Sequence, residues 1–210
     1  MALPQPAKFR NKRYIVGLSK FKRKDNLIKL SANESALGPS PKAINAFNKD
    51  KNKIFKYPES DSNALRKLIS KKFKINPNRI ICGSGSDQIF DLTCHLFLKP
   101  GDEVIVPEFG FIMHRIYSSL YKAKVILAKE KNFTVSIDEI LKKVTVKTKI
   151  VFIANPNNPT GTYLSKFEML RLRKSLRKDI LLVVDDAYFE FLNKQDFSSG
   201  LDLFKKHSNV

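Results

Sequence analysis

The chain has 210 residues, enough for one large domain with a substantial hydrophobic core or for one domain with an appendage. With 42% hydrophobic and 28% charged residues, the composition is ordinary for a globular protein and excludes a disordered or fibrous chain. The 39 Lys and Arg against 20 Asp and Glu give a net charge of +19, but they are scattered over every expected helix surface, so we expect solvated faces and no nucleic-acid partner.

Cysteine and histidine spacing argues against metal and disulfide sites. Cys82 and Cys94 do not form a CxxC pair, and the three histidines show no ligand spacing. No apolar run reaches the length of a membrane span. We therefore expect no metal, no membrane partner and a reducing, cytoplasmic location.

The expected elements alternate between helices and strands. Residues 1–35 read as a basic, irregular arm with a short strand at 27–30. Helical periodicity follows at 41–49, 62–74, 87–98, 110–121, 137–144 and 166–178. Strand patterns lie at 79–82, 103–106, 124–128, 149–154 and 180–184. This alternation predicts βαβ units and a mostly parallel sheet covered by helices on both faces.

Two serines have the spacing of capping boxes, in which a serine and a glutamate three residues later satisfy each other's backbone N–H groups. They are Ser136 with Glu139, and Ser165 with Glu168. Each pair is predicted to start a helix.

Polar motifs follow two of the buried strands. The run 149–154 leads into Asn155-Pro-Asn-Asn-Pro-Thr-Gly161, whose prolines cannot extend a ladder. The run 180–184 leads into Asp185-Asp-Ala-Tyr188. Because ligands of open α/β sheets bind at the carboxyl ends of the strands, both motifs are candidate ligand sites.

A glycine-rich turn, Gly83-Ser-Gly-Ser-Asp-Gln88, precedes the helix expected at 87–98. Free N–H groups at a helix start bind phosphate, although this turn matches neither the Rossmann nor the P-loop pattern. Another strand ends at Pro107–Phe111, which places aromatic rings at the same edge.

Together the strand ends supply a phosphate cradle, a stacking ring, an amide, a carboxylate and a phenol. A carboxylate at the end of a buried strand needs a cationic or protonated partner, because its desolvation is otherwise costly. A pyridinium nitrogen satisfies that need, so the ligand indicated is pyridoxal phosphate.

The segments that carry these groups resemble, in the same order, those of the fold-type I pyridoxal-phosphate aminotransferases of class I/II, and most closely the histidinol-phosphate aminotransferases. They are Leu30–Pro39, Tyr57–Glu59 with Leu65 and Arg66, Gly83–Gln88, Asn155–Gly161 and Asp185–Tyr188. The resemblance implies an α/β fold whose large domain, residues 36–210, has three αβα layers and is incomplete at its C-terminus. It also implies that residues 1–35 are an N-terminal arm belonging to the small domain.

The resemblance further implies how the cofactor is held. Gly85, Ser86 and Asp87 bind its phosphate through the helix start, and Phe109 stacks on its ring. Asn158 and Tyr188 would form hydrogen bonds with the phenolic oxygen.

Asp185 is the candidate catalytic residue, since pairing with the ring nitrogen would keep that nitrogen protonated and make the ring an electron sink. Tyr57 would reach the cofactor phosphate of a neighbouring subunit, which implies a homodimer. Tyr14 and Asn33 would face the amino-acid substrate.

One segment of the family pattern is absent. The Schiff-base lysine of the family follows the strand that comes after the Asp185 strand, and the chain ends at Val210, where that strand would begin. Lys166 and Lys194 are no substitutes, because one is predicted in the first turn of a surface helix and the other in a loop. We therefore expect these 210 residues to be inactive alone.

The activity implied is transamination between histidinol phosphate and 2-oxoglutarate, which gives imidazole-acetol phosphate and glutamate in histidine biosynthesis. An aromatic aminotransferase and a threonine-phosphate decarboxylase of the same fold stay open, and Glu34 after Asn33 disfavours the decarboxylase. An alternative of another class is a non-catalytic basic module that binds nucleic acid or anionic partners.

Overall fold

The computed structural model describes residues 32–210. These residues form two compact units, 32–82 and Gly83–Val210. The boundary that we expected at residue 35 stays a prediction. The expected strand at 27–30 and Tyr14 lie outside the described residues. No helix in the described part of the chain is long and apolar enough to cross a membrane.

The first unit is helical. It contains α1 (Pro41–Asp50), the 3-10 turn η1 (Lys51–Lys53), α2 (Asn63–Phe73) and the 3-10 turn η2 (Pro77–Arg79), so both helices expected here are confirmed. The strand expected at 79–82 is wrong. Ile80 has extended dihedral angles, φ −114° and ψ 127°, but no strand of the described residues pairs with this segment. An apolar extended run does not become a strand without a ladder partner.

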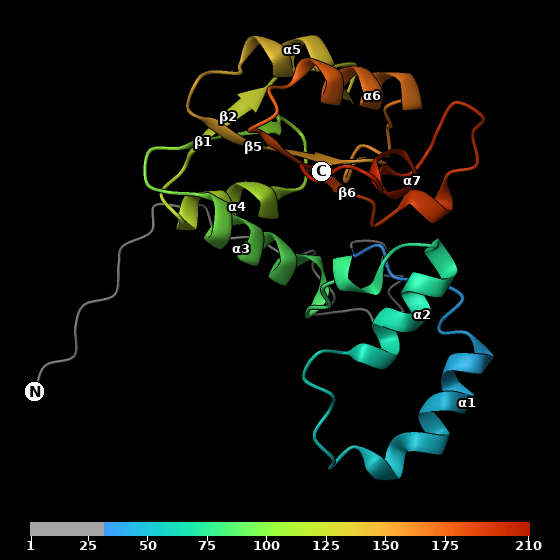
Figure 1. The fold of residues 1–210 in the computed structure, drawn as a ribbon. Helices are drawn as coiled ribbons and strands as arrows, with labels where there is room; N and C mark the ends of the chain where they lie inside the picture. Colours follow the sequence, from blue (N-terminus) through green and yellow to red (C-terminus); the bar gives the residue numbers. More distant parts are fainter. Residues whose placement is uncertain (1–31) are drawn as a thin grey trace, which may run out of the picture. The chain divides into compact units, whose positions relative to one another are not determined.

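The second unit is built on a parallel sheet of four strands, ordered β2-β1-β5-β6 (Figure 1). The strands are β1 (Glu103–Pro107), β2 (Lys124–Ala128), β5 (Thr148–Ala154) and β6 (Leu181–Asp185). The two central strands, β1 and β5, are buried over nearly their whole length. Their continuous apolar sequences are those that a sheet covered on both faces requires.

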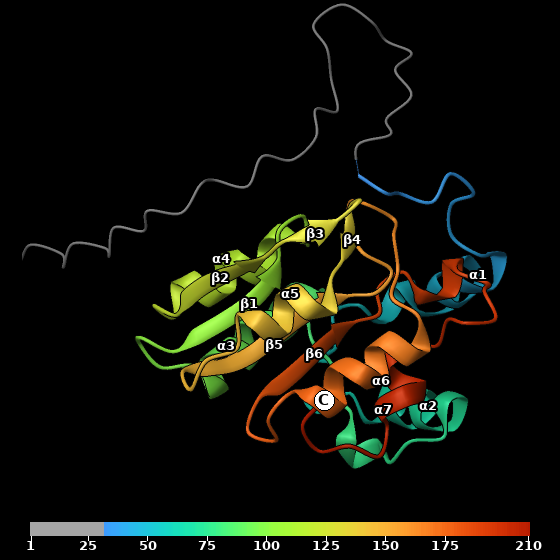
Figure 2. The same ribbon diagram turned by 90° about the horizontal axis from the view of Figure 1, so that it is seen from above.

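Helices cover the two faces of this sheet, which confirms the three-layer arrangement (Figures 1 and 2). One face carries α3 (Gly85–Phe97) and α4 (Ile112–Leu120), and the other carries α5 (Ile137–Lys142), α6 (Lys166–Ser175) and α7 (Gly200–Phe204). Each face has its own buried apolar cluster, so the strands contribute alternate side chains to two cores.

Only one of the two expected capping boxes forms. Ser165 and Glu168 satisfy each other's backbone N–H groups at the start of α6. At the start of α5, the side chain of Ser136 makes no cap hydrogen bond, and Glu139 instead accepts from Lys142 Nζ at 2.7 Å. The box at Ser136 is therefore wrong, because a surface ion pair takes the glutamate.

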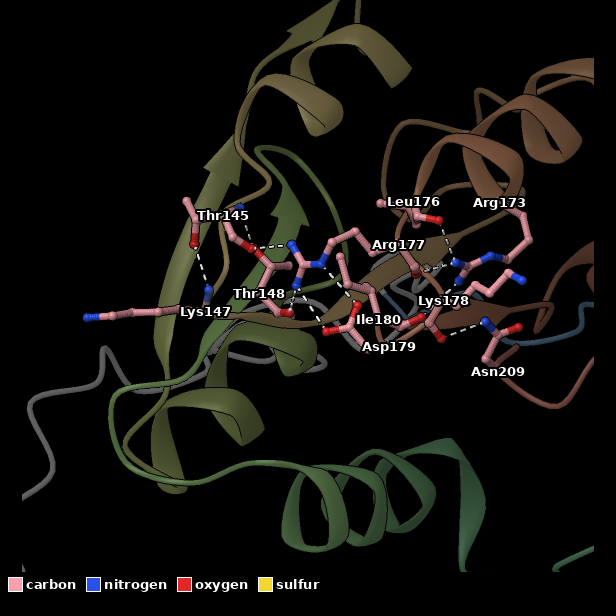
Figure 3. Close-up of polar contacts among 10 residues, drawn as sticks. All are labelled: Thr145, Lys147, Thr148, Arg173, Leu176, Arg177, Lys178, Asp179, Ile180 and Asn209. Atoms are coloured by element: carbon pink, nitrogen blue, oxygen red, sulfur yellow. Dashed lines mark hydrogen bonds and ion pairs between the residues drawn. The ribbon is translucent and has the colours of Figure 1, made fainter.

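The end of α6 is fixed to the sheet by two arginines (Figure 3). The guanidinium group of Arg173 is buried and donates to the carbonyl oxygens of Ile180 at 2.8 Å, Leu176 at 3.0 Å and Arg177 at 2.6 Å. Arg177 in turn donates to the carbonyl oxygen of Thr145 at 2.6 Å, ahead of β5. These contacts hold the amino ends of β5 and β6, at the opposite edge from the motif-bearing loops.

Candidate active site

The strand order places a topological switch point between β1 and β5. From β1 the chain moves outward to β2, then returns to the other side of β1 to form β5 and β6. The loops that leave β1 and β5 therefore diverge at their carboxyl ends, and ligands of open α/β sheets bind in such a crevice.

A cavity of about 320 Å³ opens at this edge. Six of the residues predicted to bind the cofactor line it: Gly85, Ser86, Asp87, Asn158, Asp185 and Tyr188. Ser84, Phe111 and Ala187 complete the lining. Residues that lie about a hundred positions apart in the sequence thus share one cleft, as the strand-end motifs predicted.

The glycine-rich turn presents the amino end of α3 to the cleft. Gly85 has φ +78°, a conformation that favours glycine, and its N–H donates to the carbonyl oxygen of Gly83 at 2.8 Å. The N–H of Ser84 donates to Gln88 Oε1 at 2.6 Å. No side chain caps this helix start, so its first N–H groups are suited to an anion.

The three asparagines of the Asn155–Gly161 loop have different tasks: two form hydrogen bonds within the fold, and one lines the cleft. The buried amide of Asn155 pairs with the backbone of Leu164 in both directions, at 3.2 and 2.8 Å. Asn157 is also buried, and its Nδ2 donates to Thr160 Oγ1 at 3.0 Å. Asn158 is the asparagine of this loop that lines the cleft, so the other two hold the loop in shape.

The two aspartates after β6 also have different surroundings. Asp185 lines the cleft, and one of its oxygens accepts from the N–H of Ala187 at 3.1 Å. Asp186 accepts from the N–H groups of Gly200 and Leu201, both at 3.1 Å, and so holds the start of α7. Burial raises the pKa of Asp186, whereas these two N–H donors act to lower it.

In the described part of the chain, no lysine or arginine lies within ion-pairing distance of Asp185. The side chain that faces it is the imidazole of His114 in α4, whose Nε2 lies 3.6 Å from Asp185 Oδ2. Sequence reasoning missed His114, because it searched the histidines for metal-ligand spacing only. The available signal was a histidine on the apolar face of the helix that follows the β1 loop.

One predicted site residue of the second unit, Phe109, does not line this cavity. The ring of Phe109 packs 5.6 Å from that of Phe133, whereas Phe111 takes a place in the lining. Tyr57 is fully exposed in the first unit, and Asn33 is also exposed there. The binding roles of Phe109, Tyr57 and Asn33 stay predictions.

All of the residues that the structure describes match a known protein family. The family profile described as aminotransferase class I and II matches residues 25–210. The chain belongs to this family. Its resemblance to class I/II aminotransferases, expected from the ordered motifs, is therefore confirmed.

Two curated relatives share a name within the family. The histidinol-phosphate aminotransferase of Pelagibacter ubique (strain HTCC1062) is 57% identical over 210 residues, which are 100% of this chain and 58% of the relative. That of Paramagnetospirillum magneticum (strain ATCC 700264 / AMB-1) is 43% identical over 99% of this chain and 57% of the relative. The chain thus spans somewhat more than half the length of these aminotransferases.

A solved structure supports the fold. The histidinol-phosphate aminotransferase from Sinorhizobium meliloti, solved with pyridoxal-5'-phosphate, superposes with a TM-score of 0.80 at 22% identity. The superposition covers 85% of this chain and 49% of that one. At this identity the likeness establishes the α/β aminotransferase fold, and the expected fold class is confirmed.

Proposed function

We propose that this chain is part of a pyridoxal-phosphate-dependent aminotransferase that exchanges amino groups between histidinol phosphate and 2-oxoglutarate. The observation that carries the proposal is the single cleft lined by the α3 start, Asn158, Asp185 and Tyr188. The name shared by the two relatives supports the choice of substrate.

The groups that line the cleft fit pyridoxal 5'-phosphate chemically. An uncapped start of a 13-residue helix suits a phosphate dianion. A carboxylate whose side chain is 10% exposed, with no lysine or arginine partner in residues 32–210, suits a protonated ring nitrogen. An amide and a phenol suit the ring's oxygen substituent.

Each residue then has a distinct task. The cofactor, when bound, supplies a carbonyl group for the amine and a conjugated ring that accepts electrons. The N–H groups of Ser86 and Asp87 bind the phosphate, while Asn158 and Tyr188 orient the ring through its oxygen. Asp185 would hold a proton at the ring nitrogen, and its negative charge would stabilise the positive charge there.

Further assignments belong to the same proposal. The fully exposed Tyr57 would contact the cofactor phosphate of a second copy in a homodimer. Phe109 would stack on the ring, and Asn33 and Tyr14 would face the substrate. The location proposed is the cytoplasm.

A chimera tests the proposed reaction. Residues 1–210 would replace the matching segment of the Pelagibacter ubique relative, which supplies the remainder of a full-length enzyme. With pyridoxal phosphate and 2-oxoglutarate, we expect the chimera to form glutamate faster when histidinol phosphate is the amino donor than when phenylalanine is. Glutamate formation is measured by a coupled assay.

The intact relative is the control that shows whether the segment it contributes to the chimera is active under the same conditions. Activity in the relative and none in a folded chimera would contradict the proposal. A preference for phenylalanine would favour an aromatic aminotransferase, and release of carbon dioxide from threonine phosphate would favour a decarboxylase.

A further inference from the structure

The turn after β1 has a hydrogen-bond acceptor for each of its N–H groups. Those of Glu108 and Gly110 donate to backbone carbonyl oxygens, at 2.9 and 3.2 Å. The N–H of Phe109, between them, donates to a side chain, with Glu130 Oε1 at 3.1 Å. Glu130 is the first residue of β3 (Glu130–Lys131), so a residue that follows β2 holds the turn that follows β1.

Side chains from two other elements hold the carbonyl oxygens of the same turn. Arg115 of α4 donates through Nη2 to the carbonyl oxygens of Pro107 and Glu108. Asn157, in the loop after β5, donates through Nδ2 to that of Phe109 at 3.4 Å. Both backbone polar groups of Phe109 are thus paired with side chains, and its place is set by residues distant in the sequence.

The carboxylate of Glu130 is unfavourable as a packing group. Its Oε2 is buried and has no hydrogen-bond partner in the part of the chain that the structure describes. Burial raises the pKa of this carboxyl group, whereas the N–H of Phe109 acts to lower it. An apolar side chain would avoid the cost of desolvating a carboxylate. What the glutamate provides, and an apolar residue could not, is an acceptor for the N–H of Phe109.

The residues that the turn joins stand beside the cleft. Phe111, two residues after Phe109, lines the cleft, and so does Asn158, which follows Asn157. The side chain of Phe109 is 44% exposed, and its ring lies 5.6 Å from that of Phe133 at a tilt of 49°. Part of the Phe109 ring is therefore accessible to a flat ligand, and the backbone of the turn sets where that ring can reach.

We propose that Glu130 is a positioning residue for Phe109: its carboxylate holds the N–H of Phe109 and keeps the turn after β1 in the conformation from which the ring stacks on the cofactor. The inference rests on the proposed function, in which Phe109 covers the cofactor ring. Glu130 itself touches neither cofactor nor substrate in this account, because it acts on the backbone of the residue that does.

A double-mutant cycle in the chimera separates positioning from a general effect on the fold. Glu130→Met removes the acceptor and keeps the length of the side chain, whereas Glu130→Gln keeps an acceptor oxygen. In a fluorescence titration, we expect the affinity for pyridoxal phosphate to fall about fivefold in Glu130→Met, the scale of one aromatic ring contact. Glu130→Gln should restore it. With Phe109→Ala already present, Glu130→Met should lower the affinity no further.

Two results of this cycle would overturn the inference. A loss of affinity that persists in the Phe109→Ala background would show that Glu130 does not act through Phe109. An affinity of Glu130→Met equal to that of the unaltered chimera would show that the contact does not position the ring. Glu139→Met is the matched control, because it removes another partly buried carboxylate, paired with Lys142 at 2.7 Å, and should leave the affinity unchanged.

A second readout needs no cofactor. In the chimera labelled with 15N-phenylalanine, the amide signal of Phe109 is assigned by its loss in Phe109→Ala. We expect this amide proton to exchange with solvent about tenfold faster or more in Glu130→Met, as when a hydrogen bond to a charged group is lost, and slowly again in Glu130→Gln. Equal exchange rates in the unaltered chimera and Glu130→Met would overturn the inference. If exchange behaves as expected but the chimera neither binds the cofactor nor transfers an amino group, the proposed function fails, whereas Glu130 still fixes the turn.

Discussion

In the chimera, Asp185→Asn is expected to lower kcat by about a hundredfold or more while the affinity for pyridoxal phosphate changes little. Removal of one preorganised charge-stabilising group typically costs about 10²–10³ in rate. A neutral amide cannot hold the ring nitrogen protonated, so the electron sink is lost. The phosphate contacts at the start of α3, together with Asn158 and Tyr188, remain to bind the cofactor.

Steady-state kinetics and a fluorescence titration with the cofactor measure the two quantities separately. Asp138→Asn is the matched control, because it removes the same charge from the exposed surface of α5, where Asp138 pairs with Arg171. A kcat for Asp185→Asn within about twofold of the unaltered chimera would contradict the assigned role. An equal loss of kcat in Asp185→Asn and Asp138→Asn would also contradict this role.

The second large effect is expected on stability, from Arg173→Met. The buried guanidinium group donates to three backbone carbonyl oxygens at the end of α6 and the start of β6 (Figure 3). Burial lowers the pKa of Arg173, but arginine stays protonated in proteins. Methionine removes the side-chain donor from the carbonyl groups of Leu176 and Ile180, at about 1–3 kcal/mol for each one that water does not reach, while the carbonyl of Arg177 keeps the N–H of Ile180 as a donor at 3.2 Å. We expect the free energy of unfolding to fall by about 3 kcal/mol.

Urea-induced unfolding of the chimera, followed by circular dichroism, gives this free energy. For Arg173→Lys, the free energy of unfolding should lie between those of the unaltered chimera and of Arg173→Met, because one ammonium group cannot reproduce the hydrogen bonds of the planar guanidinium group. Arg171→Met, two residues earlier in α6, removes a half-exposed partner of Asp138 and should change the value by less than about 0.5 kcal/mol. Equal unfolding midpoints for Arg173→Met and Arg171→Met would show that the buried contacts do not stabilise the fold.

Much of the second unit could be predicted from the sequence, because its two central strands are buried on both faces. Continuous apolar runs such as Lys149–Ala154 have few alternatives to a central strand. The segment 79–82 has a similar appearance but forms no ladder in the described residues. Pairing depends on a partner strand, and a single segment carries no information about its partner.

Local motifs were predictive where no competing contact existed. The Ser165 capping box forms, whereas the equally spaced box at Ser136 loses its glutamate to Lys142. The antiparallel hairpin of β3 (Glu130–Lys131) and β4 (Thr134–Val135) was missed. Its turn places Asn132 and Phe133 at φ +50° and +58°, and phenylalanine is not a recognised signal for that conformation.

In the candidate site, too, some residues could be placed from the sequence and others could not. Asp185 and Asn158 could be placed from sequence, because both follow buried strands and the carboxyl ends of parallel strands share one edge. His114 could not, since its contact with Asp185 depends on how α4 packs against the sheet. The sequence also could not show that Phe111, and not Phe109, lines the cleft, because this depends on the conformation of the turn after β1 and not on residue spacing.

The cleft at the carboxyl edge of the sheet is expected to hold pyridoxal phosphate. A crystal structure of the chimera grown with this cofactor tests it most directly. We expect the phosphate against the N–H groups of Ser86 and Asp87. The ring nitrogen should lie about 2.7–2.9 Å from the Asp185 carboxylate, the usual length of a charge-assisted hydrogen bond. A cofactor bound away from this cleft, or a ring nitrogen facing away from Asp185, would contradict the account.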